Sequence, residues 1–208
     1  MDLAQVFPTK ANLMATQKSL DLAKLGYELM DRKRNILVRE MMQLVDKART
    51  VEENIGAAYQ KAYRALKLAN ITLGVCGNFA RSTPVEKSLK LDYKSVMGVE
   101  IPCASLDETE LQPYYGMQKT NSYLDEAYIH FNEAKRLTVE LAETQASIFR
   151  LADAVKKTQK RANALNNIMI PQFTETIKFI TEALDEKERE DFTRMKVVKA
   201  TKEAKKKA

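Results

Sequence analysis

The feature that most constrains the fold is an apolar repeat that runs from Met117 to Leu184, with intervals of three and four residues in alternation. Its apolar members are Met117, Leu124, Ala127, Phe131, Ala134, Leu141, Ile148, Ala152, Val155, Ala162, Met169, Phe173, Ile180 and Ala183. This repeat is typical of the seam of a coiled coil and is too narrow for a helix that lies on a globular core. A helix of this length, about 100 Å at 1.5 Å per residue, has to lie along a partner helix.

The first third of the chain supplies such a partner. Pro8 and Thr9 mark a helix start, because the threonine oxygen can accept a hydrogen bond from an amide of the first turn. The same repeat then continues as Leu13, Thr16, Leu20, Ala23, Tyr27, Met30, Arg34, Leu37, Met41, Leu44, Ala48, Val51, Ile55, Ala58, Ala62, Ala65 and Ala69. Its alanine-rich end allows close approach but buries little apolar area, so we expect another protein on its flank. Gly74 and Gly77 are expected to end the helix.

The segment from Val75 to Gly116 has a different character. Its prolines, at positions 84, 102 and 113, exclude a continuous helix. Residues 87–102 instead predict a β-hairpin, with a turn made of Ser95, Val96, Met97 and Gly98, and Gly98 free to adopt a positive φ. Because a two-stranded hairpin is only marginally stable alone, it needs a surface to pack against.

The second long helix is expected to begin between Gln118 and Ser122, where Ser122 and Asp125 resemble a capping box in which aspartate replaces the usual glutamate. Pro171 lies inside its repeat, and we expect a bend there because the repeat resumes in phase at Phe173. The polar seam positions Gln145, Gln159 and Asn166 either fix the register between the helices or face water and partner proteins.

Together these segments predict a mainly α fold: a long antiparallel two-helix coiled coil with a short β-hairpin and loops inserted in the middle. We expect a single elongated domain, 1–208, made of helix 9–73, middle segment 75–116, helix 118–191 and tail 192–208. Six residues of the seam are expected to keep the helix pair stiff: Leu37, Met41, Leu44, Ile148, Val155 and Met169.

Charge and glycine content support this architecture and exclude several functions. Six glycines and five prolines favour long helices over many short strands. The formal net charge of +6 equals the excess of the tail from Phe192 to Ala208 alone. Nucleic-acid-binding proteins spread their bases along a face, so no nucleic-acid partner is expected. The tail itself is interpreted as a solvated end.

No constellation of residues predicts catalysis, a cofactor or a metal. His130 is the single histidine, and Cys76 and Cys103 are isolated, so we interpret both cysteines as small packing residues. Gly74 and Gly77 lack the residues of a phosphate-binding loop. No apolar run spans a membrane, and the first residues lack the features of a signal peptide, so we expect a cytoplasmic protein.

Particular residues of both helices resemble the D subunit of the vacuolar and archaeal type rotary ATPases. In the first helix these are Pro8, Thr9, Leu13, Leu20, Ala23, Gly26, Leu29, Met30, Lys33 and Arg34. In the second they are Arg161, Asn163, Ala164, Leu165, Ile170, Pro171, Thr176, Ile177, Ile180, Leu184, Glu188 and Arg189. The stretch from Arg161 to Pro171 is the most specific. Asp31, Ala162 and Asn166 depart from the family's common lysine, valine and glutamate.

The resemblance implies a non-catalytic central stalk that rotates and couples ATP hydrolysis or synthesis to proton or sodium transport, on the cytoplasmic face of the membrane. Both chain ends would enter a hexamer of A and B subunits, the small F subunit would pack on the coiled coil, and the membrane-side C subunit, called d in eukaryotes, would receive the mid-chain end. Six bases either contact carboxylates of the hexamer or simply keep the helices solvated: Arg32, Lys33, Arg34, Arg189, Arg194 and Lys196. The hairpin around Met97 and Gly98 is a candidate contact for the F subunit or the hexamer. The sequence leaves open the direction of the reaction and the transported ion.

Three other kinds of protein share parts of this pattern. A coiled-coil scaffold or membrane-tethering module would spread its bases along a helix face. A prefoldin-like chaperone has shorter chains with more apolar helix tips. The gamma subunit of the other rotary ATPase branch carries a doubly wound α/β domain, for which the segment from Val75 to Gly116 is too short.

Overall fold

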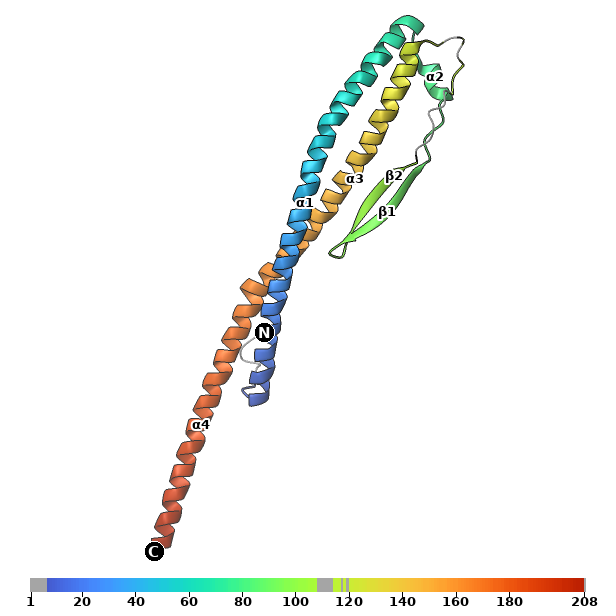
Figure 1. Ribbon diagram of the computed structural model, residues 1–208. Coiled ribbons are helices and arrows are strands. Elements are labelled where there is room, and N and C mark those ends of the chain that lie inside the picture. The colour runs from blue at the N-terminus through green and yellow to red at the C-terminus, as the bar shows by residue number, and fades with distance from the viewer. Residues whose placement is uncertain (1–6, 108–113, 117, 119, 208) are drawn as a thin grey trace. The chain divides into compact units, whose positions relative to one another are not determined.

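The computed structural model describes residues 7–107, 114–116, 118 and 120–207, with side chains up to residue 203 (Figure 1). Predictions that concern the first six residues, Pro113, Met117 and the side chains of the last lysines lie outside the described residues. The elements are α1 (Lys10–Leu73), α2 (Gly77–Ser82), β1 (Leu89–Val96), β2 (Val99–Leu106), α3 (Ser122–Ala164), the π-helix η3 (Leu165–Met169) and α4 (Ile170–Lys207). This order confirms the predicted mainly α fold, in which a two-stranded hairpin is inserted in the sequence between long helices.

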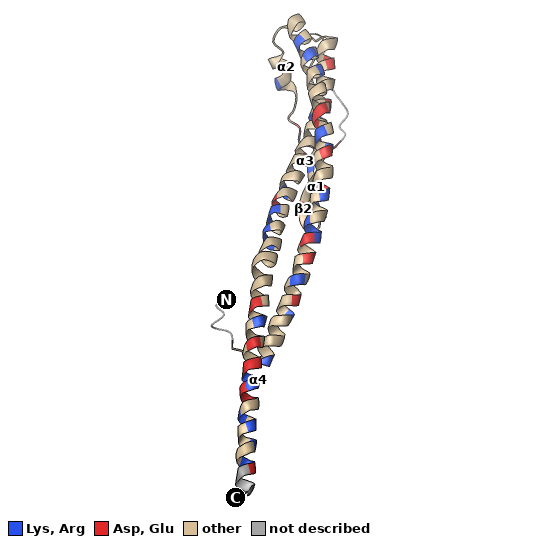
Figure 2. Cartoon of the chain, turned by 90° about the vertical axis from the view of Figure 1, so that its left-hand side faces the viewer, with Lys and Arg blue, Asp and Glu red and all other residues tan. Residues whose placement is uncertain are grey.

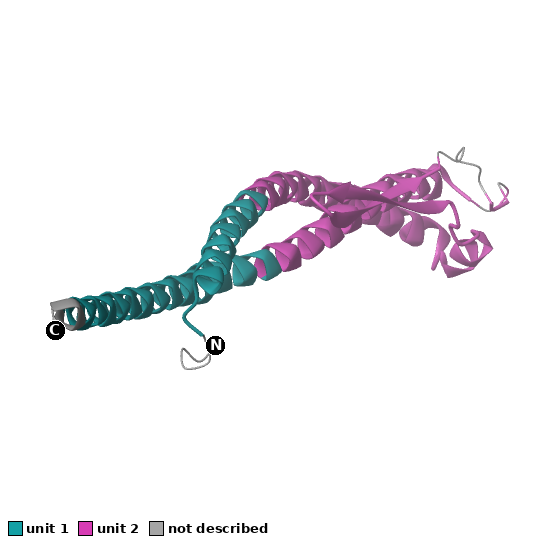
Figure 3. Cartoon of the chain, turned by 90° about the horizontal axis from the view of Figure 1, so that it is seen from below, with its two compact units in different colours: residues 1–34, 157–208 teal, residues 35–156 magenta. Residues whose placement is uncertain are grey.

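The chain divides into two compact units, shown in two colours in Figure 3. The chain-end unit contains residues 1–34 and 157–208, and the mid-chain unit contains residues 35–156. Both long helical segments therefore contribute to both units.

In the chain-end unit, the first part of α1 runs antiparallel to the C-terminal helical segment. Lys10 Nζ lies 2.9 Å from a carboxylate oxygen of Glu188. Further along α1, a Cβ added to Gly26 would lie 3.8 Å from Cδ1 of Leu165. Since the partner residue falls in number as the α1 residue rises, the two segments point in opposite directions.

In the mid-chain unit, the rest of α1 is antiparallel to α3. Lys47 pairs with Glu140 at 2.9 Å. The hydroxyls of Tyr59 and Thr138 are 3.1 Å apart, and near the end of α1 the Asn121 amide donates to the Thr72 hydroxyl at 2.6 Å. The core of this unit joins three elements, because Leu37, Ile101 and Leu151 pack together.

The predicted α1 seam agrees with burial. Every buried residue of α1 lies at a predicted seam position: Ala23, Leu37, Val51, Ala58, Ala62, Ala65 and Ala69. The buried residues before position 58 include the large side chains of Leu37 and Val51, whereas those from residue 58 onward are alanine alone, as the sequence predicts.

The α3 seam differs from the prediction in its middle. Thr144 and Leu151 are buried, whereas their predicted neighbours Gln145 and Ala152 are exposed. The reason is chemical as well as periodic, since the Thr144 hydroxyl donates to the carbonyl of Glu140 in its own helix at 3.1 Å and is thereby satisfied. A buried glutamine would need partners from the other helix.

The helix ends follow local capping chemistry. The Asn12 amide donates to the Thr9 hydroxyl at 3.2 Å, which confirms the predicted cap of α1. Gly74 has a φ of 78° and terminates α1 as predicted, but Gly77 begins α2, a short helix that the pattern did not predict. The cap of α3 is Asn121, whose side-chain oxygen accepts from the Leu124 amide at 3.2 Å, so the Ser122 capping box was wrong.

Pro171 interrupts the α-helical ladder without ending the helix, as predicted. The Ile170 amide donates to the carbonyl of Leu165, five residues back, in η3. A π turn here is consistent with a proline that lacks an N–H and whose ring crowds the carbonyl four residues before it. The helix then continues to Lys207, whereas the sequence predicted a separate tail from residue 192.

The hairpin strands are longer than predicted. Ser95 and Val96 belong to β1, and only Met97 and Gly98 form the turn, with φ values of 51° and 77°. Two positive φ values in a two-residue loop are the signature of a type I′ turn, which matches the twist of antiparallel strands. Pro102 lies within β2, opposite Tyr93.

Candidate functional site

The six candidate contact cations all lie in the chain-end unit. Three of them form exposed ion pairs within their own helix: Arg32 with Glu28 at 3.7 Å, Arg189 with Glu186 at 3.4 Å and Arg194 with Glu190 at 3.5 Å. Lys33 is half-buried and Lys196 is exposed. Exposed pairs of this kind contribute little to stability, so these cations can exchange partners at low cost.

Arg34 is placed differently from the other five. Its guanidinium lies 2.6 Å from the carboxylate of Asp31 and donates to Oε1 of Gln159 at 2.9 Å. The Gln159 amide in turn donates to Oδ1 of Asn163 at 2.8 Å. Arg34 therefore links α1 to α3 within the chain-end unit.

The most specific stretch of the sequence motif forms the π-helix and its flanks. Arg161, Asn163 and Ala164 are exposed at the end of α3. Leu165 is half-buried and faces Gly26, and Pro171 lies exposed at the start of α4. The close approach at Gly26 was not assigned a role from the sequence, although a lone glycine inside a helical repeat is a signal of such contacts.

The last part of α4 is exposed on all sides. Every described side chain from Asp185 to Glu203 is exposed, including Phe192, Met195, Val197 and Val198. Acidic and basic side chains both occur along this helix (Figure 2). Exposed large apolar side chains within a charged helix are typical of a surface that meets another protein.

In the mid-chain unit, α3 supports the hairpin through the outer edge of β2. Arg150 donates to the carbonyl of Glu100 at 3.1 Å, Ser147 donates to the carbonyl of Pro102 at 3.4 Å, and the Ala104 amide donates to Glu143 at 3.1 Å. The three side chains are spaced by four and three residues and so lie along one stripe of α3. The sequence predicted that the hairpin needs a surface, but it did not identify these residues.

The six predicted stiffening residues occupy several environments. Leu37 is fully buried, and Met41, Leu44 and Val155 are partly buried against its cluster. Ile148 is half-buried on α3. Met169 belongs to η3 in the chain-end unit and is 38% exposed. The two predicted hairpin residues, Met97 and Gly98, form the turn itself.

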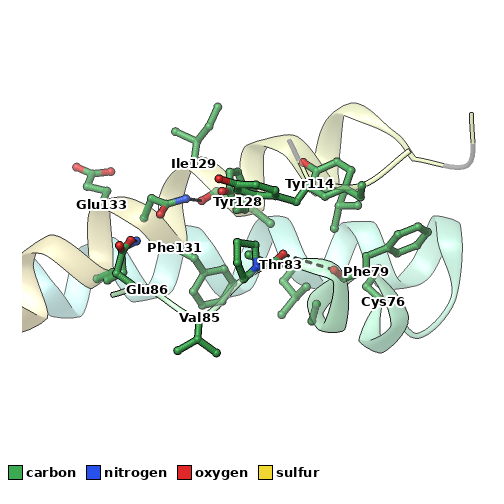
Figure 4. A pocket seen from close by; sticks show the side chains of 18 of the residues that line it. Cys76, Phe79, Thr83, Val85, Glu86, Tyr114, Tyr128, Ile129, Phe131 and Glu133 are labelled. Atoms are coloured by element: carbon green, nitrogen blue, oxygen red, sulfur yellow. Dashed lines mark hydrogen bonds and ion pairs between the residues drawn. The ribbon is translucent and has the colours of Figure 1, made fainter. Parts of the chain in front are cut away.

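A hollow of about 760 Å³ lies in the mid-chain unit between α2, the base of the hairpin and α3 (Figure 4). Its lining includes the aromatic side chains of Phe79, Tyr114, Tyr128 and Phe131. At its rim Lys135 donates to Glu86 at 2.7 Å, and this bond, with that from Ser88, lowers the pKa of Glu86 to about 2.

A second polar contact of the mid-chain unit involves Tyr115, which also lines the hollow. The Tyr115 hydroxyl donates to Asp125 at 2.6 Å. Burial of the hydroxyl, together with this bond to a carboxylate, raises the pKa of Tyr115. Cys76 is buried nearby against Ala69 and Leu124, and Cys103 is half-buried in β2. Both cysteines are free thiols.

The described residues contain no group of three metal-ligating side chains close enough to hold an ion. None of the described helices has the length and apolar character needed to cross a bilayer. The described surface therefore offers helix faces, a hairpin and a hollow as its candidate functional features.

Comparison with known proteins gives one consistent result. The family described as the D subunit of ATP synthase matches residues 12–200. The D subunit of the V-type ATP synthase of Thermotoga neapolitana is 40% identical over 93% of this chain and 97% of its own length. The D subunit of the A-type ATP synthase of Thermococcus sibiricus is 33% identical over 98% and 97%, and that of Methanopyrus kandleri is 35% identical over 98% and 90%.

Proposed function

Because this chain belongs to the family of ATP synthase D subunits, we propose that it is the central-stalk rotor of a V/A-type ATPase or ATP synthase. In this role it couples ATP hydrolysis or synthesis in a hexamer of A and B subunits to proton or sodium transport through a membrane ring. The chain acts mechanically and performs no chemistry itself, and it lies at the cytoplasmic face of the membrane as part of the complex.

The observation that carries this proposal is the antiparallel pairing of α1 with the C-terminal helical segment in each of the two units. Two helices that pack along their length resist twist better than one, which is what transmission of torque requires. The seam would act as the stiff part of the shaft, with Leu37 buried and Met41, Leu44 and Val155 packed against its cluster.

The chain-end unit is proposed to enter the hexamer. Its exposed cations Arg32, Arg189, Arg194 and Lys196 would meet carboxylates of the surrounding subunits, with Lys33 and Arg34 at the edge of that surface. Because the pairs that these arginines already make are exposed and weak, new contacts can form and break as the shaft turns. A buried and fixed pair would instead hold the rotor at one angle.

The mid-chain unit is proposed to receive the other stalk proteins. The F subunit would pack beside the alanine-rich part of α1 and the hairpin, where little apolar area holds the chain together. The membrane-side C subunit, called d in eukaryotes, would receive the end of the unit near Gly74 and Asn121.

The decisive experiment is a reversible disulfide crosslink between the chain and the hexamer. A cysteine replaces Lys196 in a chain that carries Cys76→Ser and Cys103→Ser, and a second cysteine is placed in the facing surface of one of the B subunits. If the chain is a rotor, oxidation stops ATP turnover and reduction restores it. A matched control places the cysteine pair between two static subunits of the hexamer. Turnover that continues through a complete crosslink to the chain would refute the rotor role.

A further inference from the structure

The hairpin has two edges with different environments. The outward backbone groups of β2 at Glu100, Pro102 and Ala104 bond to side chains of α3. In an antiparallel pair, a residue whose backbone points outward faces a partner whose backbone also points outward, on the other edge. The partners are Ser95, Tyr93 and Leu91, so the N–H and C=O groups of these β1 residues point away from the hairpin.

The β1 edge is unpaired in the part of the chain that the structure describes. The sheet has two strands, and no hydrogen bond from outside the hairpin reaches the backbone of Leu89, Leu91 or Tyr93. The side chains of these residues share one face of the hairpin and are 47%, 57% and 61% exposed. An exposed edge with an apolar row is a template for another strand.

The charged side chains next to this apolar row indicate which partner strand can pair with the β1 edge. Lys90 and Asp92 lie on the opposite face, one on each side of Leu91. We propose that the β1 edge pairs with the β1 edge of a second copy of this chain, about a two-fold axis through Leu91, to give a four-stranded antiparallel sheet.

This register satisfies both the backbone and the side chains. Leu91 opposes Leu91 and Leu89 opposes Tyr93 at positions whose outward N–H and C=O groups bond to each other. Lys90 of each copy opposes Asp92 of the other at the closer, non-hydrogen-bonded positions, where opposite charges stabilise the pair.

The pair that Lys90 already makes is compatible with this register. Its ammonium group lies 2.8 Å from a carboxylate oxygen of Asp107, and both side chains are exposed. Because an exposed pair of this kind is weak, the ammonium group can turn towards a second carboxylate at low cost.

The register centred one residue further along, on Asp92, is disfavoured by charge. If the axis passed through Asp92, that carboxylate would face its own copy, and Lys90 would face Lys94. Like charges directly opposite each other destabilise a strand pair. Lysine on an edge strand ordinarily prevents pairing, but in the proposed register each Lys90 meets an aspartate.

The inference concerns the chain outside any complex and does not depend on the rotor role. Sedimentation velocity of the full chain over a wide range of concentrations should show a monomer–dimer equilibrium. Lys90→Asp and Asp92→Lys each place like charges opposite each other at two symmetric positions. The dissociation constant of the dimer should therefore rise roughly tenfold or more in each variant alone. Mixed together, the two variants restore both opposite-charge pairs and should form a heterodimer.

Two further variants isolate the edge. Leu91→Pro removes an outward N–H and leaves the β1–β2 ladder intact, so it should abolish the dimer. Glu100→Lys makes the same charge change as Asp92→Lys on the other strand and should leave the dimer unchanged. Hydrogen exchange at the Ala104 amide, which bonds to Glu143, verifies that the hairpin is folded in each variant.

Three results would overturn the proposal. They are a chain that is monomeric at every concentration, a dimer that persists in both Asp92→Lys and Leu91→Pro, and a mixture of the two charge variants that stays monomeric.

Discussion

The guanidinium of Arg34 and the side-chain amide of Gln159 meet across the two helices of the chain-end unit, with Nη1 2.9 Å from Oε1. The same guanidinium pairs with Asp31 one turn earlier in α1. A residue expected from the sequence to face the hexamer thus also fixes one helix against the other. The contact gives the chain-end unit a defined register, because both side chains must be opposite each other to bond.

Replacing Gln159 with leucine should lower the free energy of unfolding by about 1 kcal/mol, less than the roughly 1.5–3 kcal/mol of a hydrogen bond to a charged group, since Arg34 remains partly solvated. Urea unfolding of the chain, followed by circular dichroism, measures the change. Arg32→Met is the matched control, because it removes an exposed pair within one helix and should have little effect. Equal losses in both variants would mean that the Arg34 contact adds nothing across the helices.

Replacing Gly26 with alanine should stabilise the chain by up to about 1 kcal/mol. A Cβ at this position would meet Leu165 at an ordinary contact distance of 3.8 Å, and alanine is the better helix former. Gly26→Ile should destabilise it, because a branched side chain would overlap Leu165. Thermal unfolding midpoints of the two variants should move in opposite directions, and a lower midpoint for Gly26→Ala would contradict the packing described.

Replacing Leu151 with alanine should cost about 2–5 kcal/mol, the range for a fully buried leucine. It should also raise hydrogen exchange in β2, because Leu151 packs directly on Ile101. The control is Phe149→Ala, two residues away, whose side chain is 79% exposed and should matter little for the isolated chain. If Leu151→Ala and Phe149→Ala lowered the free energy of unfolding equally, Leu151 would not be the core residue described here.

Acid should release the segment before β1 from α3. The bond from Lys135 lowers the pKa of Glu86 from its ordinary value of 4.5 to about 2. A lowered pKa in the folded state means that the contact contributes fully above pH 4.5 and is lost as pH falls towards 2. Proteolysis or hydrogen exchange around Lys87 and Ser88 between these pH values measures the release.

The Lys135→Met variant provides the comparison for this pH dependence. It should show the segment released from α3 already at neutral pH, so that acid then affects only the bonds that Glu86 accepts from Ser88 within the segment. A variant that keeps the parent's acid transition would mean that another carboxylate controls this segment.

The sequence predicted those parts of the fold that depend on local pattern. The α1 seam, the Thr9 cap, the Gly74 terminus and the turn at Gly98 follow from periodicity and from backbone freedom at single residues. The α3 seam was displaced in part because a buried threonine satisfies its hydroxyl in its own helix, so Thr144 takes the place expected near Gln145.

Contacts between distant segments were beyond sequence reasoning. The support of β2 by Glu143, Ser147 and Arg150 depends on where the hairpin packs along α3, and no local pattern fixes that position. The hollow beside α2 and the pairing of Arg34 with Gln159 depend on tertiary placement in the same way. Family resemblance supplied the proposed role, and it identified the stretch around Pro171 without indicating a π-helix.

The exposure of α4 from Arg189 to Glu203 bears on how this segment behaves in the isolated chain. A solvated helix is held by its backbone hydrogen bonds and by ion pairs one turn apart, and both weaken towards a free end. It therefore frays progressively on warming while the packed turns before it persist. In the proposed rotor, this part of α4 would become rigid only when the surrounding subunits pack on it, so its stiffness would be a property of the assembly.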